Sequence, residues 1–157
     1  MSAPGARPRV VVLVGLPGSG KSTWVKAQPA AALSSDAIRM LLADDATDQS
    51  IHQRVFVTLR YLLRHRLAIG RPVSYVDATN LTPEERRPYI EIARRYGGDA
   101  EAVFFDVPLE VCRERNRGRD RTVPEEAIDR LAAKLVPPRL EEGFSKIHVI
   151  GAFPAGD

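Results

Sequence analysis

Short apolar runs alternate along the chain with longer amphipathic stretches whose apolar residues recur at helical spacing. The predicted strands are Arg9–Val14, Ala31–Ser34, Val73–Val76, Glu101–Val107 and Lys146–Ile150. The predicted helices are Lys21–Ala27, Asp36–Leu42, Ser50–Ala68, Pro83–Tyr96, Leu109–Asn116 and Pro124–Leu135. This alternation predicts an α/β fold with a five-stranded, mainly parallel sheet flanked by helices. In such a sheet, the working site lies at the carboxyl ends of the strands.

The length of 157 residues is that of one globular domain. We expect a flexible start over residues 1–8, one domain over residues 9–150 and a tail over residues 151–157, because both ends are rich in Pro, Gly and Ala. No apolar run approaches the roughly 20 residues that span a bilayer, and the N-terminus has no signal-peptide core. The single cysteine, Cys112, excludes an internal disulfide. These features predict a cytoplasmic protein with no membrane partner.

The net charge of +3 conceals a bias toward arginine, with 19 arginines against 4 lysines. Coding bias in a GC-rich genome is one explanation, but it does not explain clustering. Five arginines fall within residues 113–121, and a second group lies within residues 54–71, where there is no Asp or Glu. Because the planar guanidinium donates two hydrogen bonds at once, such clusters are suited to phosphate. The composition therefore permits an anionic partner.

The first predicted strand leads directly into a phosphate-loop motif. Residues 15–22 read GLPGSGKS, in which two glycines have four residues between them and are followed by Lys21 and Ser22. Backbone N–H groups of such a loop surround phosphates, and the following helix adds its positive end. Lys21 can reach the β- and γ-phosphates, and the Ser22 hydroxyl can bind Mg²⁺. The candidate residues for binding ATP, or another nucleoside triphosphate, are Gly15, Pro17, Gly18, Ser19, Gly20, Lys21, Ser22 and Thr23.

The second and third predicted strands each end in residues that suit a phosphate acceptor or a metal ion. Asp36 can take the proton of an attacking hydroxyl, and Arg39, one helical turn later, can contact a phosphate. Alternatively, Asp36 is only a helix N-cap and Arg39 a solvated side chain. Asp77 can hold a magnesium-bound water or stabilise the next loop. We expect Thr79 and Asn80 to be structural.

The arginine cluster over residues 113–121 is a candidate lid over the nucleotide. Arg115 and Arg119 lie four residues apart, so a helix places them on one face, as it does Arg113 and Arg117. A lid arginine can stabilise the charge of the transferring phosphoryl group, although an exposed basic helix end has the same pattern. Arg121 remains unassigned.

A basic helix is predicted around residues 54–71. Its expected buried stripe is Val55, Phe56, Leu59, Leu62, Leu63 and Leu67. Its arginines, Arg54, Arg60, Arg64 and Arg66, form either a solvated face or a phosphate-lined acceptor groove.

Together these motifs resemble the kinase module of the polynucleotide 5′-hydroxyl kinases, especially those of bacterial RNA repair. The matching segments are GLPGSGKSTW, SSDAIR, residues 44–49, VDATN, FFDVP, ERNRGR and EGF. The resemblance implies a phosphate-loop kinase fold with an arginine-rich lid and an ATP- and Mg²⁺-dependent reaction. It further implies that Asp36 is the general base, that Arg39 contacts the acceptor phosphate, and that Arg115 and Arg119 contact the ATP phosphates.

Three functions remain open at this point. The first is phosphorylation of a 5′-hydroxyl end of RNA or DNA, which makes a nucleic acid the expected partner. The second is a kinase for a sugar, nucleoside or antibiotic, and the third is a nucleotide-binding switch with slow ATPase activity. The sequence predicts no protein partner and leaves the oligomeric state open.

Overall fold

The computed structural model describes residues 6–119 and 123–151. Arg121 lies outside the described residues, as do parts of the predicted start and tail, so the predicted domain limits stay a prediction. The strands are β1 (Arg9–Val14), β2 (Ala32–Ser34), β3 (Val73–Asp77), β4 (Asp99–Asp106) and β5 (Lys146–Gly151). The helices are α1 (Lys21–Lys26), α2 (Ser35–Ala43), α3 (His52–Ala68), α4 (Pro83–Arg95), α5 (Leu109–Arg117), α6 (Glu125–Lys134) and the 3₁₀ helix η1 (Leu140–Glu142).

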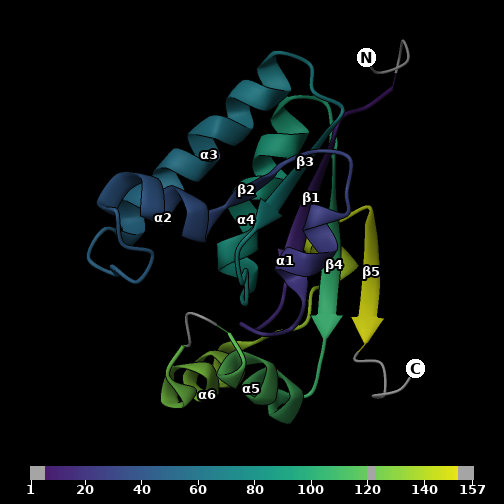
Figure 1. Ribbon diagram of the computed structural model, residues 1–157. Helices are drawn as coiled ribbons and strands as arrows, with labels where there is room; N and C mark the ends of the chain where they lie inside the picture. The colour runs from purple at the N-terminus through teal and green to yellow at the C-terminus, as the bar shows by residue number, and fades with distance from the viewer. Residues whose placement is uncertain (1–5, 120–122, 152–157) are drawn as a thin grey trace.

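The strands form one sheet in the order β2-β3-β1-β4-β5. Every strand pairing among the described residues is parallel, and β1 lies at the centre, where Val10 is opposite Ser74 on one side and Ala100 on the other. The prediction of an α/β fold is therefore confirmed, and the sheet is parallel throughout these pairings. Parallel strands place their carboxyl ends at one edge, and in Figure 1 the arrows of β4 and β5 point toward α5 and α6.

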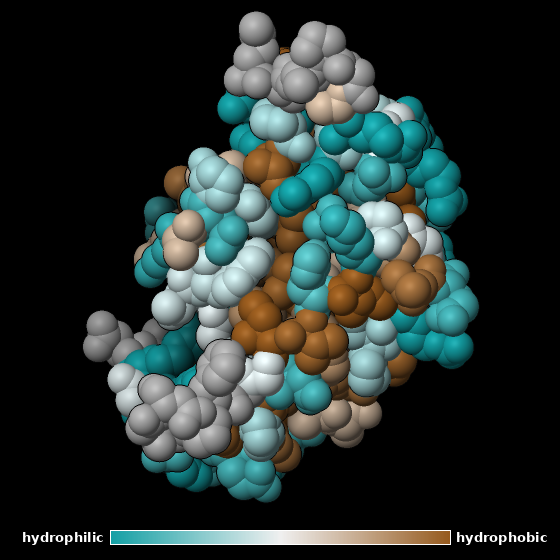
Figure 2. All heavy atoms as spheres, turned by 90° about the vertical axis from the view of Figure 1, so that its right-hand side faces the viewer, coloured by the Kyte–Doolittle hydropathy of each residue, from teal (hydrophilic) through white to brown (hydrophobic). Residues whose placement is uncertain are grey.

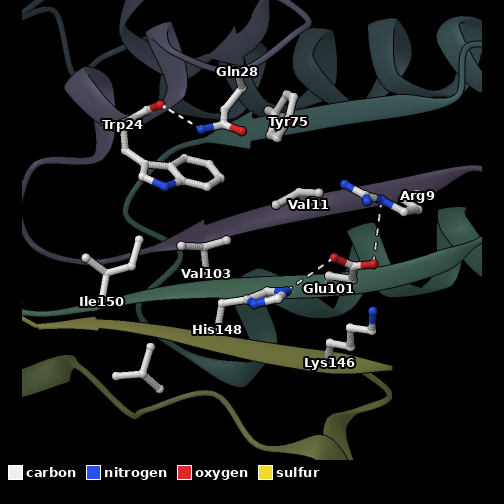
Figure 3. Close-up of a pocket in the computed structure, with 11 residues that line it drawn as sticks. Arg9, Val11, Trp24, Gln28, Tyr75, Glu101, Val103, Lys146, His148 and Ile150 are labelled. Atoms are coloured by element: carbon white, nitrogen blue, oxygen red, sulfur yellow. Dashed lines mark hydrogen bonds and ion pairs between the residues drawn. The ribbon is translucent and has the colours of Figure 1, made fainter.

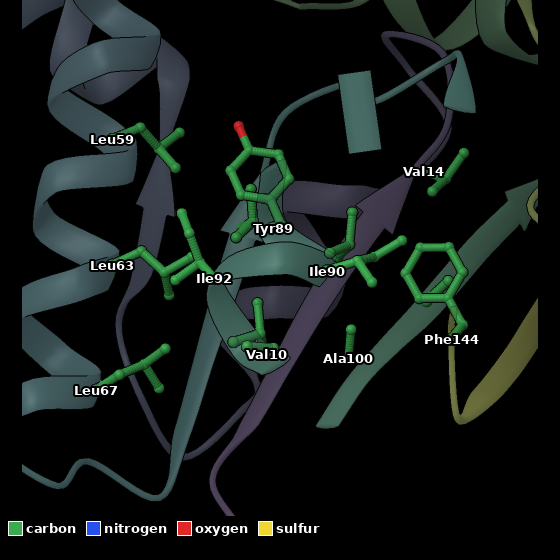
Figure 4. Packing of buried hydrophobic residues seen from close by; sticks show 14 of the residues in the cluster. Val10, Val14, Leu59, Leu63, Leu67, Tyr89, Ile90, Ile92, Ala100 and Phe144 are labelled. Carbon is green, nitrogen blue, oxygen red and sulfur yellow. The ribbon is translucent and has the colours of Figure 1, made fainter. Parts of the chain in front are cut away.

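One face of the sheet is packed against α3 and α4. Valines of β1 and alanines of β4 contact the buried side of α3 and the apolar side of α4 in one continuous core (Figure 4). Leu59, Leu63 and Leu67 recur every four residues, so α3 turns one leucine per turn toward this core. This core fixes α3, and through it α2, at the β2 edge of the sheet.

The opposite face is covered less completely. Trp24 of α1 packs edge-on against Tyr75 and Phe105, with 6.0 Å between ring centroids in each pair. Beyond α1, a hollow of about 490 Å³ opens over β1, β4 and β5. In Figure 2, apolar side chains gather in the middle of the side that β5 borders, among polar ones. Within the described residues, no helix is both long and apolar enough to cross a membrane.

Candidate active site

The phosphate loop leaves β1 at the carboxyl edge of the sheet and enters α1. Gly18 and Gly20 have φ angles of 84° and 101°, a left-handed conformation that favours glycine. A Cβ atom on Gly18 would lie 2.5 Å from the carbonyl oxygen of Cys112 in α5, so the loop and the lid helix are in direct contact. Ser19 is buried, and its hydroxyl has no hydrogen-bond partner among the described residues. An unpaired buried polar atom in this loop fits a site built for a phosphate group.

Lys21 lies inside the loop. Its Nζ donates hydrogen bonds of 2.9 Å to the carbonyl oxygens of both Gly15 and Leu16. Burial lowers the pKa of Lys21 to about 8, although the nearby carboxylates of Asp77 and Asp36 partly oppose the shift. A nucleotide phosphate at this position would favour the charged form of the lysine, because it is a further negative charge beside a buried ammonium.

Ser22 and Asp77 come together as a candidate magnesium site. The Ser22 hydroxyl donates a hydrogen bond to the Asp77 carboxylate, and burial is the main reason that the pKa of Asp77 is raised. Mg²⁺ is usually bound by one or two carboxylate or hydroxyl oxygens together with phosphates and water. This pair therefore fits the expected donor set, and within residues 6–119 and 123–151 no cluster of three metal-ligating side chains competes with it.

Asp36 lies in the first turn of α2, facing the phosphate loop. Its charge acts on both Lys21 and Asp77, which places it beside the nucleotide site. The N-cap of α2 is Ser34, whose Oγ accepts a hydrogen bond of 3.2 Å from the backbone N–H of Ala37. The N-cap alternative considered for Asp36 is therefore wrong, because Ser34 already fills that position.

Arg39 is buried on the next turn of α2. Its Nη1 donates a hydrogen bond of 2.9 Å to the carbonyl oxygen of Asp48, in the loop between α2 and α3. The alternative of a solvated Arg39 is wrong, since only 4% of the residue is exposed. Arg39 therefore connects α2 to the loop that leads into α3.

Arg115, in the last turn of the lid helix α5, and Arg119, two residues beyond the end of this helix, lie near the phosphate loop. A Cβ atom on Gly20 would lie 3.5 Å from Nη1 of Arg115, and the charge of Arg119 acts on Lys21. Arg115 lies in the helix, whereas Arg119 follows Gly118, the C-cap of α5, so the helix face that the spacing predicts for this pair does not extend to Arg119. Their arrangement lets both guanidinium groups approach phosphates held by the loop.

The other lid arginines connect α5 to α6. Arg113 forms an ion pair with Asp129, and Arg117 donates a hydrogen bond of 2.6 Å from Nε to Oε1 of Glu125. Asn116 is buried and reaches across the turn that joins the two helices. Its Nδ2 donates to the carbonyl oxygen of Val123, and its Oδ1 accepts the backbone N–H of the same residue. The sequence analysis gave Asn116 no role, although this residue lies within the matching segment ERNRGR.

A buried polar network contacts the end of β1, just before the phosphate loop. Nδ2 of Asn80 donates to the carbonyl oxygen of Leu13 at 2.7 Å, directly before the phosphate loop. Arg86 is fully buried; it forms two hydrogen bonds of 2.8 Å with Glu142 and donates Nη1 to the carbonyl oxygens of Asn80 and Val136. Asn80 has the structural role expected of it. Glu142 begins the matching segment EGF, but its pairing with Arg86 could not be predicted because the two residues lie 56 positions apart.

The basic helix α3 differs in one respect from its prediction. Val55, Leu59, Leu63 and Leu67 are buried and Phe56 is half-buried, but Leu62 is exposed because its position falls outside the stripe that faces the core. Arg66 has a structural role, since Nε and Nη2 donate to Ser74 Oγ and the Val73 carbonyl oxygen. Arg54, Arg60 and Arg64 lie outside the buried stripe: Arg54 is exposed, and the other two are half-buried.

The hollow on the open sheet face is separate from the phosphate loop. Figure 3 shows Trp24 and Gln28 on one side and His148 and Lys146 on the other. Glu101 lies between Arg9 and His148, with ion-pair distances of 3.6 Å to each. The hollow contains none of the candidate site residues predicted from the sequence.

Comparison with known proteins gives the site a context. A family model described as an AAA domain matches residues 10–138. The L-seryl-tRNA(Sec) kinase of Methanococcus maripaludis is 26% identical over 136 residues, which are 82% of this chain and 53% of that protein. The bifunctional polynucleotide phosphatase/kinase of Schizosaccharomyces pombe is 25% identical over 146 residues, which are 90% of this chain and 33% of that protein. The chain thus spans about half the length of one relative and a third of the other.

A solved structure of the Pnkp1/Rnl/Hen1 RNA repair complex contains a chain with the same fold. The TM-score is 0.69 at 23% identity, and the match covers 85% of this chain and 47% of that chain. The phosphate-loop kinase fold expected from the sequence is therefore confirmed.

Proposed function

We propose that this chain, which belongs to the AAA-domain family whose model matches residues 10–138, is a kinase for the 5′-hydroxyl end of RNA or DNA. The phosphate donor is ATP or another nucleoside triphosphate. The observation that carries the proposal is the arrangement of α2 and α5 on two sides of one phosphate loop. Asp36 and Arg39 lie on the α2 side, and Arg115 and Arg119 lie on the α5 side.

The reaction follows from this arrangement. The acceptor hydroxyl oxygen bonds to the γ-phosphorus, and the bond from that phosphorus to the β–γ bridging oxygen breaks. Asp36 takes the hydroxyl proton, and the nucleoside diphosphate leaves. Phosphoryl transfer depends mainly on positioning and on charge stabilisation, which Lys21, Arg115 and Arg119 are placed to supply.

Magnesium fits the same site through Ser22 and Asp77. When bound, the ion neutralises charge on the phosphate oxygens. Arg39 orients a phosphate of the acceptor, and its hydrogen bond to the carbonyl oxygen of Asp48 holds the guanidinium in place.

The relatives support a nucleic-acid acceptor. The S. pombe protein is named as a polynucleotide kinase, and the M. maripaludis protein as a kinase of L-seryl-tRNA(Sec). The first name describes a polynucleotide acceptor, and the second an acceptor that carries a tRNA. The 5′-hydroxyl end is favoured because the phosphate loop occurs here together with Asp36, Arg39 and the paired lid arginines.

An acceptor panel with γ-labelled ATP tests the proposal. We expect label to enter 5′-hydroxyl RNA or DNA, and not nucleosides, sugars or seryl-tRNA. Asp36→Asn removes the base and is expected to lower kcat by about 10²- to 10⁴-fold. Asp44→Asn, an exposed aspartate after the same helix, is the matched control and retains activity.

Other outcomes of the panel contradict the proposal in distinct ways. Label in a sugar or nucleoside alone makes the protein a small-molecule kinase, and label in seryl-tRNA alone makes it a kinase of that tRNA. ATP hydrolysis that no acceptor stimulates and that Asp36→Asn leaves unchanged makes it a nucleotide switch.

A further inference from the structure

The outer side of α3 carries cations and apolar groups together. The buried stripe of this helix faces the sheet, so the residues on the opposite side face solvent at a spacing of three or four. This outer strip consists of Arg54, Val57, Tyr61 and Arg64. Tyr61 and Val57 are 54% and 49% exposed, and these values are high for an aromatic and a β-branched apolar residue. The Tyr61 ring is supported edge-on by His65, with 4.4 Å between centroids.

The charge of α3 is unbalanced. No acidic residue occurs between Asp48 and Asp77, whereas α4 mixes its arginines with three glutamates. In the part of the chain that the structure describes, Arg113, Arg117 and Arg86 form ion pairs with carboxylates, but no ion pair involves Arg54, Arg60 or Arg64. A row of cations without counter-charges attracts an extended polyanion.

The outer strip begins beside the proposed acceptor site. Arg39 holds the carbonyl oxygen of Asp48, and α3 starts four residues later at His52. In Figure 1, α2 and α3 lie side by side, and α3 leads away from the end of the sheet where α5 lies. The 17 residues of α3 give it a length of about 25 Å, enough for several nucleotides of an extended strand.

We propose that the outer strip of α3 binds the single-stranded part of the acceptor that follows its 5′-terminal nucleotide. Arg54 and Arg64, about 15 Å apart along the helix axis, pair with phosphates that are more than one nucleotide apart, and Tyr61 stacks on a base between them. Arginines that follow the backbone and aromatic rings that stack bases are the two parts of sequence-independent single-strand recognition. This inference rests on the proposed function, which it extends by making oligonucleotides better acceptors than single nucleotides.

The test compares two acceptors that share the same reacting hydroxyl. One is a nucleoside 3′-phosphate, and the other is a 5′-hydroxyl single strand of about twelve nucleotides. The measured quantity is the ratio of kcat/KM for the oligonucleotide to kcat/KM for the nucleotide. We expect Arg54→Gln combined with Arg64→Gln to lower this ratio about tenfold, and Tyr61→Ala to lower it about fivefold or more.

The matched control removes two charges from another helix. Arg87→Gln combined with Arg95→Gln changes two exposed arginines of α4 and has the same effect on net charge. We expect this control to keep the ratio of the wild-type protein. Loss of two phosphate contacts also makes the dependence of log(kcat/KM) on log salt shallower by about 1.4 for the oligonucleotide. Should the double variant of α3 fail to fold, the exposed single change Arg54→Gln gives the same comparison.

The failures are distinguishable. A wild-type protein that phosphorylates neither acceptor overturns the proposed function and this inference together. A wild-type protein that phosphorylates both, with a ratio that the α3 variants leave unchanged or lower no more than the α4 control does, overturns the inference and leaves the proposed function standing.

Discussion

Lys21 combines burial with a charge that the proposed reaction needs. Its ammonium group is inside the phosphate loop and bound to two carbonyl oxygens, yet burial lowers its pKa to about 8 from 10.5. Keeping this lysine charged at neutral pH therefore destabilises the folded protein, and a bound phosphate would offset this cost through its negative charge. Ser19 shows the same feature in a neutral side chain, since its buried hydroxyl has no partner in the described residues.

This lowered pKa predicts a pH-dependent stability. Between pH 8 and 10.5 the unfolded chain holds a proton on Lys21 that the folded chain has lost, so the free energy of unfolding rises with pH in that window. The rise for the wild-type protein relative to Lys21→Met is on the order of 3 kcal/mol. Urea unfolding of both proteins at several pH values measures it.

The control for this measurement is Lys26→Met, which removes an exposed lysine from the same helix. The difference in free energy of unfolding between Lys26→Met and the wild-type protein should stay constant across the same pH window. If the free energy of unfolding of the wild-type protein does not rise above pH 8 relative to that of Lys21→Met, then burial does not destabilise the charged form of Lys21.

At the scale of elements, α5 divides its arginines between two tasks. Arg115 and Arg119 face the phosphate loop, and Arg113 and Arg117 bind carboxylates of α6. Arg113 and Arg115 lie on different faces of this nine-residue helix, and Arg119 follows two residues after its end at Arg117. The proposed lid therefore has an inner side for phosphate and an outer side that keeps it folded.

This division predicts unequal effects of two similar substitutions. Arg115→Ala removes a cation beside the loop and is expected to lower kcat by about 10³-fold, the low end for an arginine at a transferring phosphoryl group. Arg113→Ala breaks a partly exposed ion pair and should change kcat by no more than a few-fold. Steady-state kinetics of both variants under saturating ATP make the comparison, and equal losses would contradict it.

Local signals predicted the elements well. Each helix and strand expected from the sequence is present with ends shifted by one or two residues, because apolar periodicity and capping act within a few residues. The spacing of the lid arginines gave two equivalent pairs, and only the resemblance singled out Arg115 and Arg119; Arg115 does lie beside Gly20 of the loop. The prediction that Leu62 belongs to the buried stripe of α3 was wrong. Leu62 and Leu63 are adjacent leucines, and packing against the sheet decides which of them is buried.

Contacts between distant segments could not be predicted in this way. The bond from Arg39 to the carbonyl oxygen of Asp48 depends on how the loop after α2 folds back, and no residue type marks a backbone acceptor. Asn116 and the pair of Arg86 with Glu142 depend on segments that meet only in the folded chain. These residues position the candidate site, whereas the phosphate loop and Asp36 lie in local motifs that the sequence makes visible.

At the scale of the whole molecule, Arg86 joins the parts that carry the site. Its guanidinium group contacts the loop after β3 at Asn80, the segment after α6 at Val136, and the 3₁₀ helix η1 at Glu142. Burial raises the pKa of Glu142, but hydrogen bonds from Arg86 and from the Arg139 backbone N–H outweigh it and hold the pKa below its usual value. The donor site and the lid therefore share one buried anchor.

Removing this anchor should destabilise the protein strongly. Arg86→Ala leaves the Glu142 carboxylate and two backbone carbonyl oxygens without their partner, which costs about 3–5 kcal/mol. Arg95→Ala, an exposed arginine at the end of the same helix, is the control and should cost less than about 0.5 kcal/mol. Urea unfolding at neutral pH gives both values. A loss below about 1 kcal/mol for Arg86→Ala would mean that the network is not a structural anchor.

The position of the transferred phosphate tests the central claim most directly. A 5′-hydroxyl oligonucleotide is incubated with γ-labelled ATP and the protein, and the product is digested to nucleoside 5′-monophosphates. We expect all label to appear in the 5′-terminal nucleoside monophosphate, and Asp36→Asn to lower its rate of formation by about 10²- to 10⁴-fold. Label that stays in ATP or inorganic phosphate, while a small hydroxyl compound is phosphorylated in its place, would contradict the account.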